Sequence, residues 1–203
     1  MKLYYSPGAC SLSPHIVARE AGIPIEPVKV DLKAHRTEDG RDYYQINPRG
    51  YVPALELDDG TLVREGPAIV QYLADQAPAA GLAPPAGTME RVRLQEWLTF
   101  IGTEIHKMYG WLFNPKAPEE AKQIAREKIA TRYVDIDRHL AANTWLLGER
   151  FSPADAYLFV TLNWANAFKV DLSPYPNLKA YHERVRQRPK VREAMRAEGL
   201  IKD

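Results

Sequence analysis

The sequence predicts an α/β domain followed by an all-α helical domain. In the first part, short apolar strand candidates alternate with amphipathic helices, and in the last part apolar residues recur only at helical spacing. Between these parts, residues 78–88 hold three prolines, two glycines and four alanines, a composition typical of a linker. We therefore expect an α/β domain over residues 1–80, a linker over 81–88 and a helical domain over 89–203.

The α/β domain opens as strand, helix, strand. Residues 3–5 form a short aromatic and aliphatic strand candidate. A helix is expected to begin near Ser11, because Pro14 fits its first turn, and Gly22 ends it. Residues 25–31 predict a second strand, with two valines on one face.

A hairpin and a second helix follow. Residues 33–47 are polar and show no strong period, so we expect a long loop with one helical turn. Two apolar runs, 52–57 and 61–63, flank Asp58-Asp59-Gly60 and predict a β-hairpin. Residues 67–77 then predict a helix that starts with proline.

The carboxyl-terminal part predicts helices throughout. Residues 89–109 carry an apolar stripe at positions 94, 98, 101, 105 and 108, and residues 119–140 carry another. Further helices are expected to start at Ser152, where Ser152-Pro153-Ala154-Asp155 is a capping box, and near Pro176.

Composition excludes several classes of partner. The net charge is +1, from 27 basic and 26 acidic side chains, so nothing favours nucleic acid or an anionic membrane. No apolar run has the length of a membrane span or a signal peptide. The one cysteine, Cys10, can form no internal disulfide and no cysteine-rich metal site. We expect a cytoplasmic protein without a metal.

Cys10 is the first candidate for chemistry. A lone cysteine is often a small buried apolar residue, but Cys10 follows a glycine turn at a predicted helix start. Unpaired N–H groups there favour a thiolate, and the preceding strand should deliver the thiol to the carboxyl edge of the sheet. Its position therefore predicts a thiol of low pKa. No second cysteine follows at CxxC spacing, which weakens a dithiol oxidoreductase.

Several motifs occur in a fixed order along the chain. They are MKLYYSPGACSLSPH (1–15), NPRGYVPAL (47–55), LDDGTL (57–62), Glu65-Gly66, QYLAD (71–75), EW (96–97), TEIHK (103–107) and GERFSPADAY (148–157). In this order and spacing the sequence resembles the bacterial beta class of cytosolic glutathione S-transferases over nearly its whole length. The resemblance implies a thioredoxin-like amino-terminal domain, a homodimer and glutathione as co-substrate, with no permanently bound cofactor.

The resemblance also implies a glutathione site in the first domain. A cis peptide before Pro53 would aim the backbone of Val52 at the cysteinyl unit of glutathione. Glu65 and Gly66 precede a helix and would receive the charged γ-glutamyl end, although an acid there also simply stabilises the helix dipole. His35 stands where relatives often have a lysine for the glycine carboxylate. Arg36 is an alternative anchor.

The helical domain contributes the remaining candidates. Thr99, Thr103 and His106 are spaced to share one face of the 89–109 helix, away from its apolar stripe. The resemblance places His106 beside the glutathione sulfur, and imidazole titrates near neutrality, which suits thiol activation. Glu104 is included as a further glutathione contact. Because other classes use a tyrosine or serine hydroxyl, Tyr5 and Ser11 remain alternatives to Cys10.

Two functions fit these observations. The first is a transferase that joins glutathione to a small hydrophobic electrophile, with Met108, Tyr109, Trp111 and Phe113 as candidates for the apolar pocket. The second is a glutathione-dependent monothiol disulfide reductase, or a ligand-binding stress protein without catalysis. The identity of the electrophile does not follow from the sequence.

Overall fold

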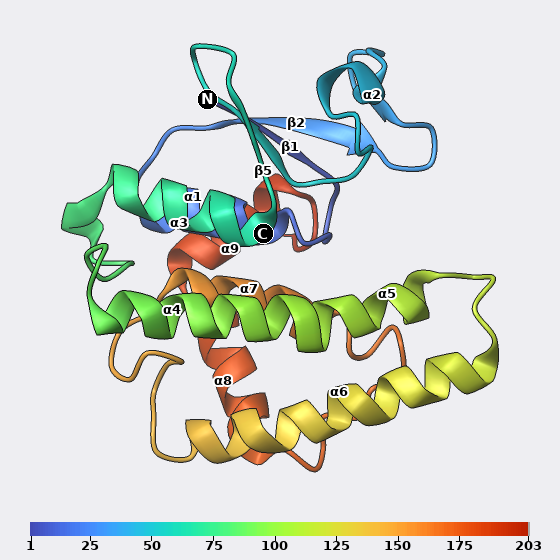
Figure 1. Cartoon of the computed structure of the whole chain (residues 1–203), viewed down its shortest axis with the longest axis vertical. Coiled ribbons are helices and arrows are strands. Elements are labelled where there is room, and N and C mark those ends of the chain that lie inside the picture. The colour runs from blue at the N-terminus through green and yellow to red at the C-terminus, as the bar shows by residue number, and fades with distance from the viewer. Residues whose placement is uncertain (203) are drawn as a thin grey trace. The chain divides into compact units, whose positions relative to one another are not determined.

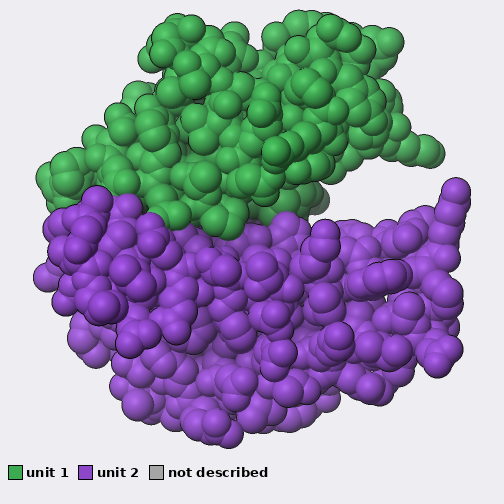
Figure 2. Space-filling view, viewed as in Figure 1, with its two compact units in different colours: residues 1–83, 187–203 green, residues 84–186 purple. Residues whose placement is uncertain are grey.

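The computed structural model describes residues 1–202, and these form two compact units. One unit comprises residues 1–83 together with the segment from Gln187 onward, and the other comprises residues 84–186 (Figure 2). The predicted division placed all of 89–203 in the helical domain. The structure differs because helix α9 (Pro189–Ala197) packs on helix α1 (Leu12–Glu20) of the first unit.

The first unit is built on a five-stranded mixed sheet. Its strand order is β3-β2-β1-β4-β5, in which β1 and β2 are parallel and the other neighbours are antiparallel. The strands are β1 (Lys2–Tyr5), β2 (Glu26–Asp31), β3 (Arg36–Thr37), β4 (Ala54–Glu56) and β5 (Leu62–Arg64). The predicted strand, helix, strand and hairpin are all present, and β3 is an addition within the expected loop.

Helices cover both faces of this sheet. Helices α1, α3 (Gly66–Gln76) and α9 lie on one face, and the short α2 (Tyr43–Ile46) lies on the other (Figure 1). Tyr4 pairs with Val28 and Ala54 in the ladder, and all three pack against Tyr43. Since side chains alternate along a strand, Leu3 faces the opposite, three-helix side.

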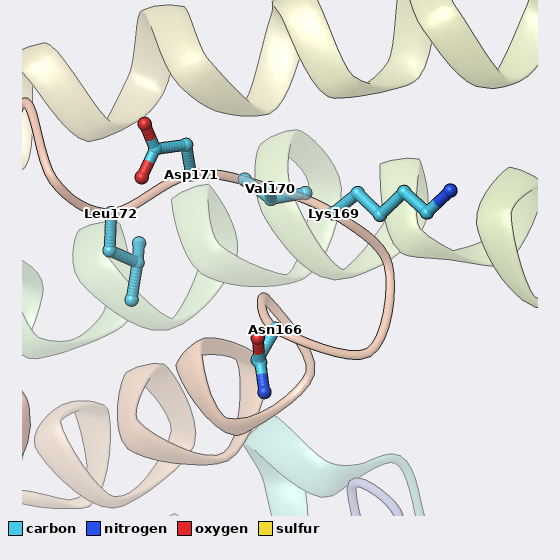
Figure 3. Close-up of a pocket in the computed structure, with 5 residues that line it drawn as sticks. All are labelled: Asn166, Lys169, Val170, Asp171 and Leu172. Carbon is cyan, nitrogen blue, oxygen red and sulfur yellow. The ribbon is translucent and has the colours of Figure 1, made fainter.

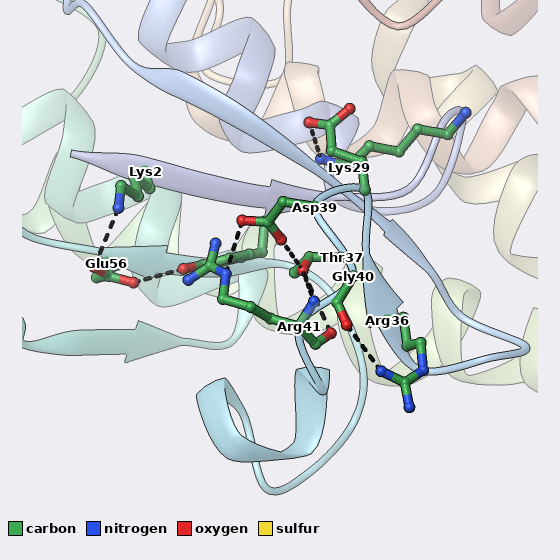
Figure 4. A network of polar contacts seen from close by, with 10 residues as sticks. Lys2, Lys29, Arg36, Thr37, Asp39, Gly40, Arg41 and Glu56 are labelled. Atoms are coloured by element: carbon green, nitrogen blue, oxygen red, sulfur yellow. Dashed lines mark hydrogen bonds and ion pairs between the residues drawn. The ribbon is translucent and has the colours of Figure 1, made fainter.

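A polar network fixes the loop after β3 to the sheet (Figure 4). The Tyr4 hydroxyl donates to Glu56 at 2.6 Å, and burial together with this carboxylate raises the pKa of Tyr4 to about 12. Arg41 donates to Asp39 at 2.8 Å, and the Thr37 hydroxyl also donates to Asp39. These contacts hold the stretch that follows the predicted site residue at position 35.

The second unit is helical, as predicted. A π-helical segment (Ile101–His106) joins its first two helices, and a short 3-10 turn (Pro78–Ala80) precedes the unit in the chain. The α-helices are α4 (Met89–Phe100), α5 (Lys107–Phe113), α6 (Glu119–Leu140), α7 (Pro153–Asn163) and α8 (Pro176–Arg186). With the mixed sheet of the first unit, they confirm the predicted fold class.

The π-helical segment changes the register of the first long helix. Buried positions recur at Leu94, Leu98, Ile101, Ile105 and Tyr109. The predicted stripe ended at position 108 instead, because it assumed one period throughout. A π turn closes from i to i+5, so it takes up one extra residue and brings position 109 into the core.

The predicted capping box begins helix α7. The Asp155 carboxylate accepts from the Ser152 N–H at 2.8 Å, from the Leu146 N–H at 2.9 Å and from the Tyr181 hydroxyl at 2.9 Å. Complete burial raises the pKa of Asp155. The carboxylate thus ties three segments of the unit together, in line with a folding role rather than a catalytic one.

Candidate functional site

Cys10 lies in the turn between β1 and α1. Its Sγ–H donates to the backbone oxygen of Val52 at 3.3 Å. Burial raises the pKa of the thiol to about 12, and the charge of Glu65 adds to this, against a lowering effect of the Cys10 and Ser11 N–H groups. The prediction of a low-pKa thiol is therefore wrong, because desolvation outweighs the helix N-terminus.

The side chains of the two alternative residues, Ser11 and Tyr5, are buried. The Ser11 hydroxyl is fully buried, accepts from the Ser6 N–H at 3.1 Å and donates to the Ser6 oxygen at 3.3 Å. The Tyr5 ring is 8% exposed and packs edge-on against His15, with a centroid distance of 6.2 Å. Neither hydroxyl therefore competes well with Cys10 as a ligand-facing group.

Val52 and Pro53 form the edge opposite Cys10. Their peptide bond is cis, which confirms the prediction. Within residues 1–202 the Val52 N–H has no hydrogen-bond partner, and the Val52 oxygen holds only the Cys10 thiol. The edge thus offers one donor and one acceptor to an extended ligand, as an unpaired strand does.

Glu65 and Gly66 lie next to this edge. Glu65 precedes α3 with a φ of 69°, a left-handed conformation that is uncommon for a residue other than glycine. Its Oε1 accepts from Arg49 at 2.5 Å and from the Tyr51 hydroxyl at 3.2 Å. A Cβ atom on Gly66 would lie 3.8 Å from the Pro53 ring, so the start of α3 adjoins the Val52 edge.

His35 is held by the turn that precedes the edge. Its Nδ1 lies 3.0 Å from the Gly50 oxygen, and its ring stacks on Tyr44 with a centroid distance of 4.5 Å. Since a carbonyl can only accept, Nδ1 carries the proton, and Nε2 can donate to a carboxylate only in the imidazolium form. Arg36 is directed to the Gly40 oxygen at 2.8 Å (Figure 4).

In the second unit, His106 belongs to an aromatic cluster. His106 Nδ1 and the Tyr157 hydroxyl share a hydrogen bond of 2.5 Å, and the His106 and Trp164 rings lie 5.1 Å apart. The prediction that His106 points away from the core of its own domain is wrong. It lies at the end of the π-helical segment, which changes its angle relative to Thr99 and Thr103.

The other candidates of this unit are exposed or paired within it. Thr99 and Thr103 are exposed, and the Thr103 hydroxyl donates to the Thr99 oxygen at 3.0 Å. Glu104 accepts from two nitrogens of Arg132 on α6, at 2.9 and 2.7 Å. Glu104 is thus part of an ion pair that links the π-helical segment to α6.

The predicted pocket residues separate into two groups. Tyr109 is fully buried and shares a hydrogen bond of 3.0 Å with the Tyr133 hydroxyl, so its assignment to a pocket wall is wrong. Trp111 and Phe113 are 49% and 50% exposed, and Phe113 packs against Trp164 at 5.2 Å. The register shift in the preceding segment explains why Tyr109 turns inward.

A separate hollow lies in the loop between α7 and α8 (Figure 3). It has a volume of about 370 Å³ and is open to solvent. Its lining combines one cation, one anion and aliphatic side chains, so it carries no net charge that would select an ion. The lining residues are Asn166, Lys169, Val170, Asp171 and Leu172.

The described residues contain neither a metal-binding cluster nor a membrane-spanning helix. Residues 1–202 contain no group of three or more histidine, cysteine, aspartate or glutamate side chains placed to hold a metal ion. Over the same residues, every helix is too short or too polar to cross a membrane.

Comparison with known families identifies the fold. Residues 8–76 match the family described as glutathione S-transferase, N-terminal domain, and residues 96–189 match glutathione S-transferase, C-terminal domain. The chain is also 46% identical to glutathione S-transferase GstA of Escherichia coli O157:H7, over 98% of this chain and all of that protein. This chain belongs to the glutathione S-transferase family.

Solved structures of glutathione S-transferases agree. The bacterial enzyme BphK in a ternary complex is 54% identical, with a TM-score of 0.97 over 98% of this chain and 100% of that one. A sphingomonad glutathione S-transferase complexed with glutathione is 48% identical, with a TM-score of 0.95 over 99% and 100%. A bacterial beta class enzyme of Sphingomonas chungbukensis is 48% identical, with a TM-score of 0.96 over 99% and 100%. The predicted class is confirmed.

Three side-chain contacts of the candidate residues of this transferase could not be predicted from the sequence. Arg49 pairs with Glu65, and Tyr51 donates to the same oxygen. Arg49 and Tyr51 belong to the motif that contains the Asn-Pro-Arg-Gly turn. That motif predicted a turn but indicated nothing about their side-chain contacts. Tyr157 ends the motif over residues 148–157, and the structure reveals its hydrogen bond to His106.

Proposed function

We propose that this chain joins the thiol of glutathione to small apolar electrophiles. The main support is the continuous edge formed by Cys10, the Val52 backbone and the start of α3 at Gly66. A free N–H and a weakly held C=O at Val52 match the peptide-like cysteinyl unit of glutathione. Family membership supports the same co-substrate.

The ends of glutathione would be bound on either side of this edge. The N–H groups at the start of α3 attract a carboxylate, and Glu65 attracts an ammonium group, which together match the γ-glutamyl end. Glu65 is held by Arg49, and this leaves its Oε2 for the ligand. His35, as imidazolium, is the proposed anchor for the glycine carboxylate, with Thr99, Thr103 and Glu104 as further proposed contacts.

His106 is the proposed group that stabilises the glutathione thiolate. When the Tyr157 hydroxyl donates to Nδ1, the proton of neutral His106 lies on Nε2, which then donates to a thiolate. When Nδ1 donates to Tyr157, Nε2 accepts a proton instead. Tyr157 therefore suits both steps of thiol activation. Cys10, which stays a neutral thiol, adds a weak S–H donor rather than a charge.

The raised pKa of Cys10 argues against monothiol disulfide exchange. Thiolate is the reacting form, and with a pKa of about 12 only about one molecule in 100,000 carries it near pH 7. Conjugation does not require Cys10 to ionise. We therefore favour the transferase over the reductase.

A binding and activity panel tests the proposal. Retention on immobilised glutathione, followed by turnover of aryl halides, epoxides and mixed disulfides, should give conjugation without disulfide reduction. His106→Ala should lower the conjugation rate and raise the pH at which activity appears. Lys107→Ala, at the exposed neighbouring position, is the control. Failure to bind glutathione, or an unchanged pH profile in His106→Ala, would contradict these assignments.

Two further properties are part of the proposal. A homodimer is expected from the family, and sedimentation of the purified chain tests it. A cytoplasmic location agrees with the single unpaired thiol, because a reducing compartment keeps such a group reduced. Fractionation of cells that express the chain tests the location.

A further inference from the structure

Helix α9 is tied to the first unit at both of its ends. At the start, two nitrogens of Arg188 donate to Glu20, the last residue of α1, at 2.7 and 2.8 Å. At the other end, Glu198 contacts His15 near the start of α1. The two helices therefore run antiparallel, and the carboxyl-terminal end of α9 lies beside the turn that precedes α1.

Glu198 makes two hydrogen bonds there. Its Oε1 lies 3.0 Å from His15 Nδ1, and its Oε2 accepts from the Gly8 N–H at 3.0 Å. Both side chains of the Glu198–His15 pair are 0% exposed. A buried carboxylate is costly unless its oxygens are paired, so these two contacts determine where the Glu198 side chain can lie.

His15 is held from other directions as well. The Tyr5 ring packs against it, and its Nε2 is buried with no hydrogen-bond partner in the described chain. A buried nitrogen without a partner, such as Nε2, lowers the stability of the fold. The contribution of His15 therefore comes from the contact that its other nitrogen, Nδ1, makes with Glu198. That contact orients Glu198 towards Gly8.

Gly8 lies two residues before Cys10. Its φ of 71° places it in the left-handed region, and a Cβ atom there would be 3.4 Å from Leu200, which follows α9. The Ala9 N–H closes the same turn on the Ser6 oxygen at 3.0 Å. Cys10 then reaches Val52 from this turn. The Gly8 N–H is therefore the point at which Glu198 can act on the Cys10–Val52 edge.

We propose that Glu198, oriented by His15, is a positioning residue that holds the 6–10 turn so that Cys10 and Val52 stay aligned for the cysteinyl unit of glutathione. The proposal rests on the proposed function, and it assigns to the carboxyl-terminal segment a role in the glutathione site of the first unit.

Glu198→Ala should loosen the turn. We expect alkylation of Cys10 by iodoacetamide at a fixed pH of about 8 to become about tenfold faster, which corresponds to about 1.4 kcal/mol. The KM for glutathione should rise by a similar factor, because only the ordered fraction of the protein binds, while kcat stays unchanged once glutathione is bound. Glu198→Gln can accept from Gly8 and, when the His15 proton moves from Nδ1 to Nε2, donate to His15, so it should restore both values.

Arg188→Ala is the matched control. It removes the Glu20 tether at the other end of α9 and leaves the 6–10 turn untouched. It should lower Tm by about 2–4 °C with alkylation and KM as in the wild type. Equal effects of Arg188→Ala and Glu198→Ala would show that α9 merely stabilises the unit and would overturn the proposal. Unchanged alkylation in Glu198→Ala would also overturn it.

Two features keep the test decisive. If Glu198→Ala fails to fold, hydrogen exchange in the wild type replaces it: the Gly8 amide should exchange as slowly as the amides of β1, and rapid exchange would refute the proposal. Alkylation of Cys10 needs no transferase activity. A chain that fails to conjugate glutathione but shows the predicted alkylation pattern would therefore contradict only the proposed function.

Discussion

The reactivity of Cys10 should depend on pH in an unusual way. The pKa of about 12 lies far above the ordinary value of 9.0, because the thiol is buried and the negative charge of Glu65 adds to the effect of burial. At neutral pH the thiolate fraction of Cys10 should be about 1,000-fold lower than that of an ordinary cysteine, since each pKa unit changes this fraction about tenfold. Alkylation by iodoacetamide should therefore be slower by about this factor, and its rate should rise about tenfold per pH unit from neutral pH up to about pH 11.

Intact mass spectrometry measures this directly, because Cys10 is the only cysteine in the chain. The chain unfolded in urea is the control, and its alkylation rate should level off near the ordinary pKa of a cysteine thiol. A folded-state profile that levels off near pH 9, or a neutral rate equal to that of the unfolded chain, would refute the argument that burial dominates at this site.

Three further changes should have measurable effects. Tyr157→Phe removes the hydrogen bond to His106 and should lower the conjugation rate by about tenfold, with a shifted pH–rate profile. Gly50→Ala would place its Cβ 2.5 Å from the Tyr44 ring and should destabilise the chain by about 1–3 kcal/mol in urea unfolding. Burial raises the pKa of Tyr133 well above its usual value. Stability from this group is complete below about pH 10 and is lost as the pH rises further, so the urea midpoint should stay constant up to about pH 10 and fall above it.

Each of these three predictions has a measurable result that would contradict it. A pH–rate profile in Tyr157→Phe identical to that of the wild type would remove Tyr157 from thiol activation. Gly60→Ala is the control for Gly50→Ala, because it has a similar positive φ of 83° but no atom near its Cβ. Equal losses in the two variants would mean that strain, not the Tyr44 clash, sets the cost. A urea midpoint that stays constant up to about pH 11 would contradict the argument on Tyr133.

Local signals allowed most of the fold to be predicted. The Asp58-Asp59-Gly60 turn predicted the hairpin, and the regular spacing of apolar residues predicted α6. The structure confirms both elements. The π-helical segment over 101–106 could not be predicted in this way. A single wide turn leaves no composition signal, and its only trace is the shift of the buried position from 108 to 109.

The site was harder to predict because its properties depend on groups distant in sequence. The position of Cys10 suggested an activating helix terminus, whereas its actual environment is set by Val52 and by burial. The partners of Glu65 and His106 come from other elements, and nothing at residue 198 marks it as a neighbour of residue 8. Periodicity assigns faces to helices, but it does not say which elements meet.

The hydrogen bond between Gly8 and Glu198 spans 190 positions of the chain, and this has a consequence for biosynthesis. At roughly 5–20 residues per second, a ribosome needs about 10–40 seconds to add the second partner after the first. During that interval the whole of residues 84–186 is made as one continuous segment. The helical unit can therefore fold on the ribosome, while the first unit is completed only when the segment from Gln187 to Glu198 emerges.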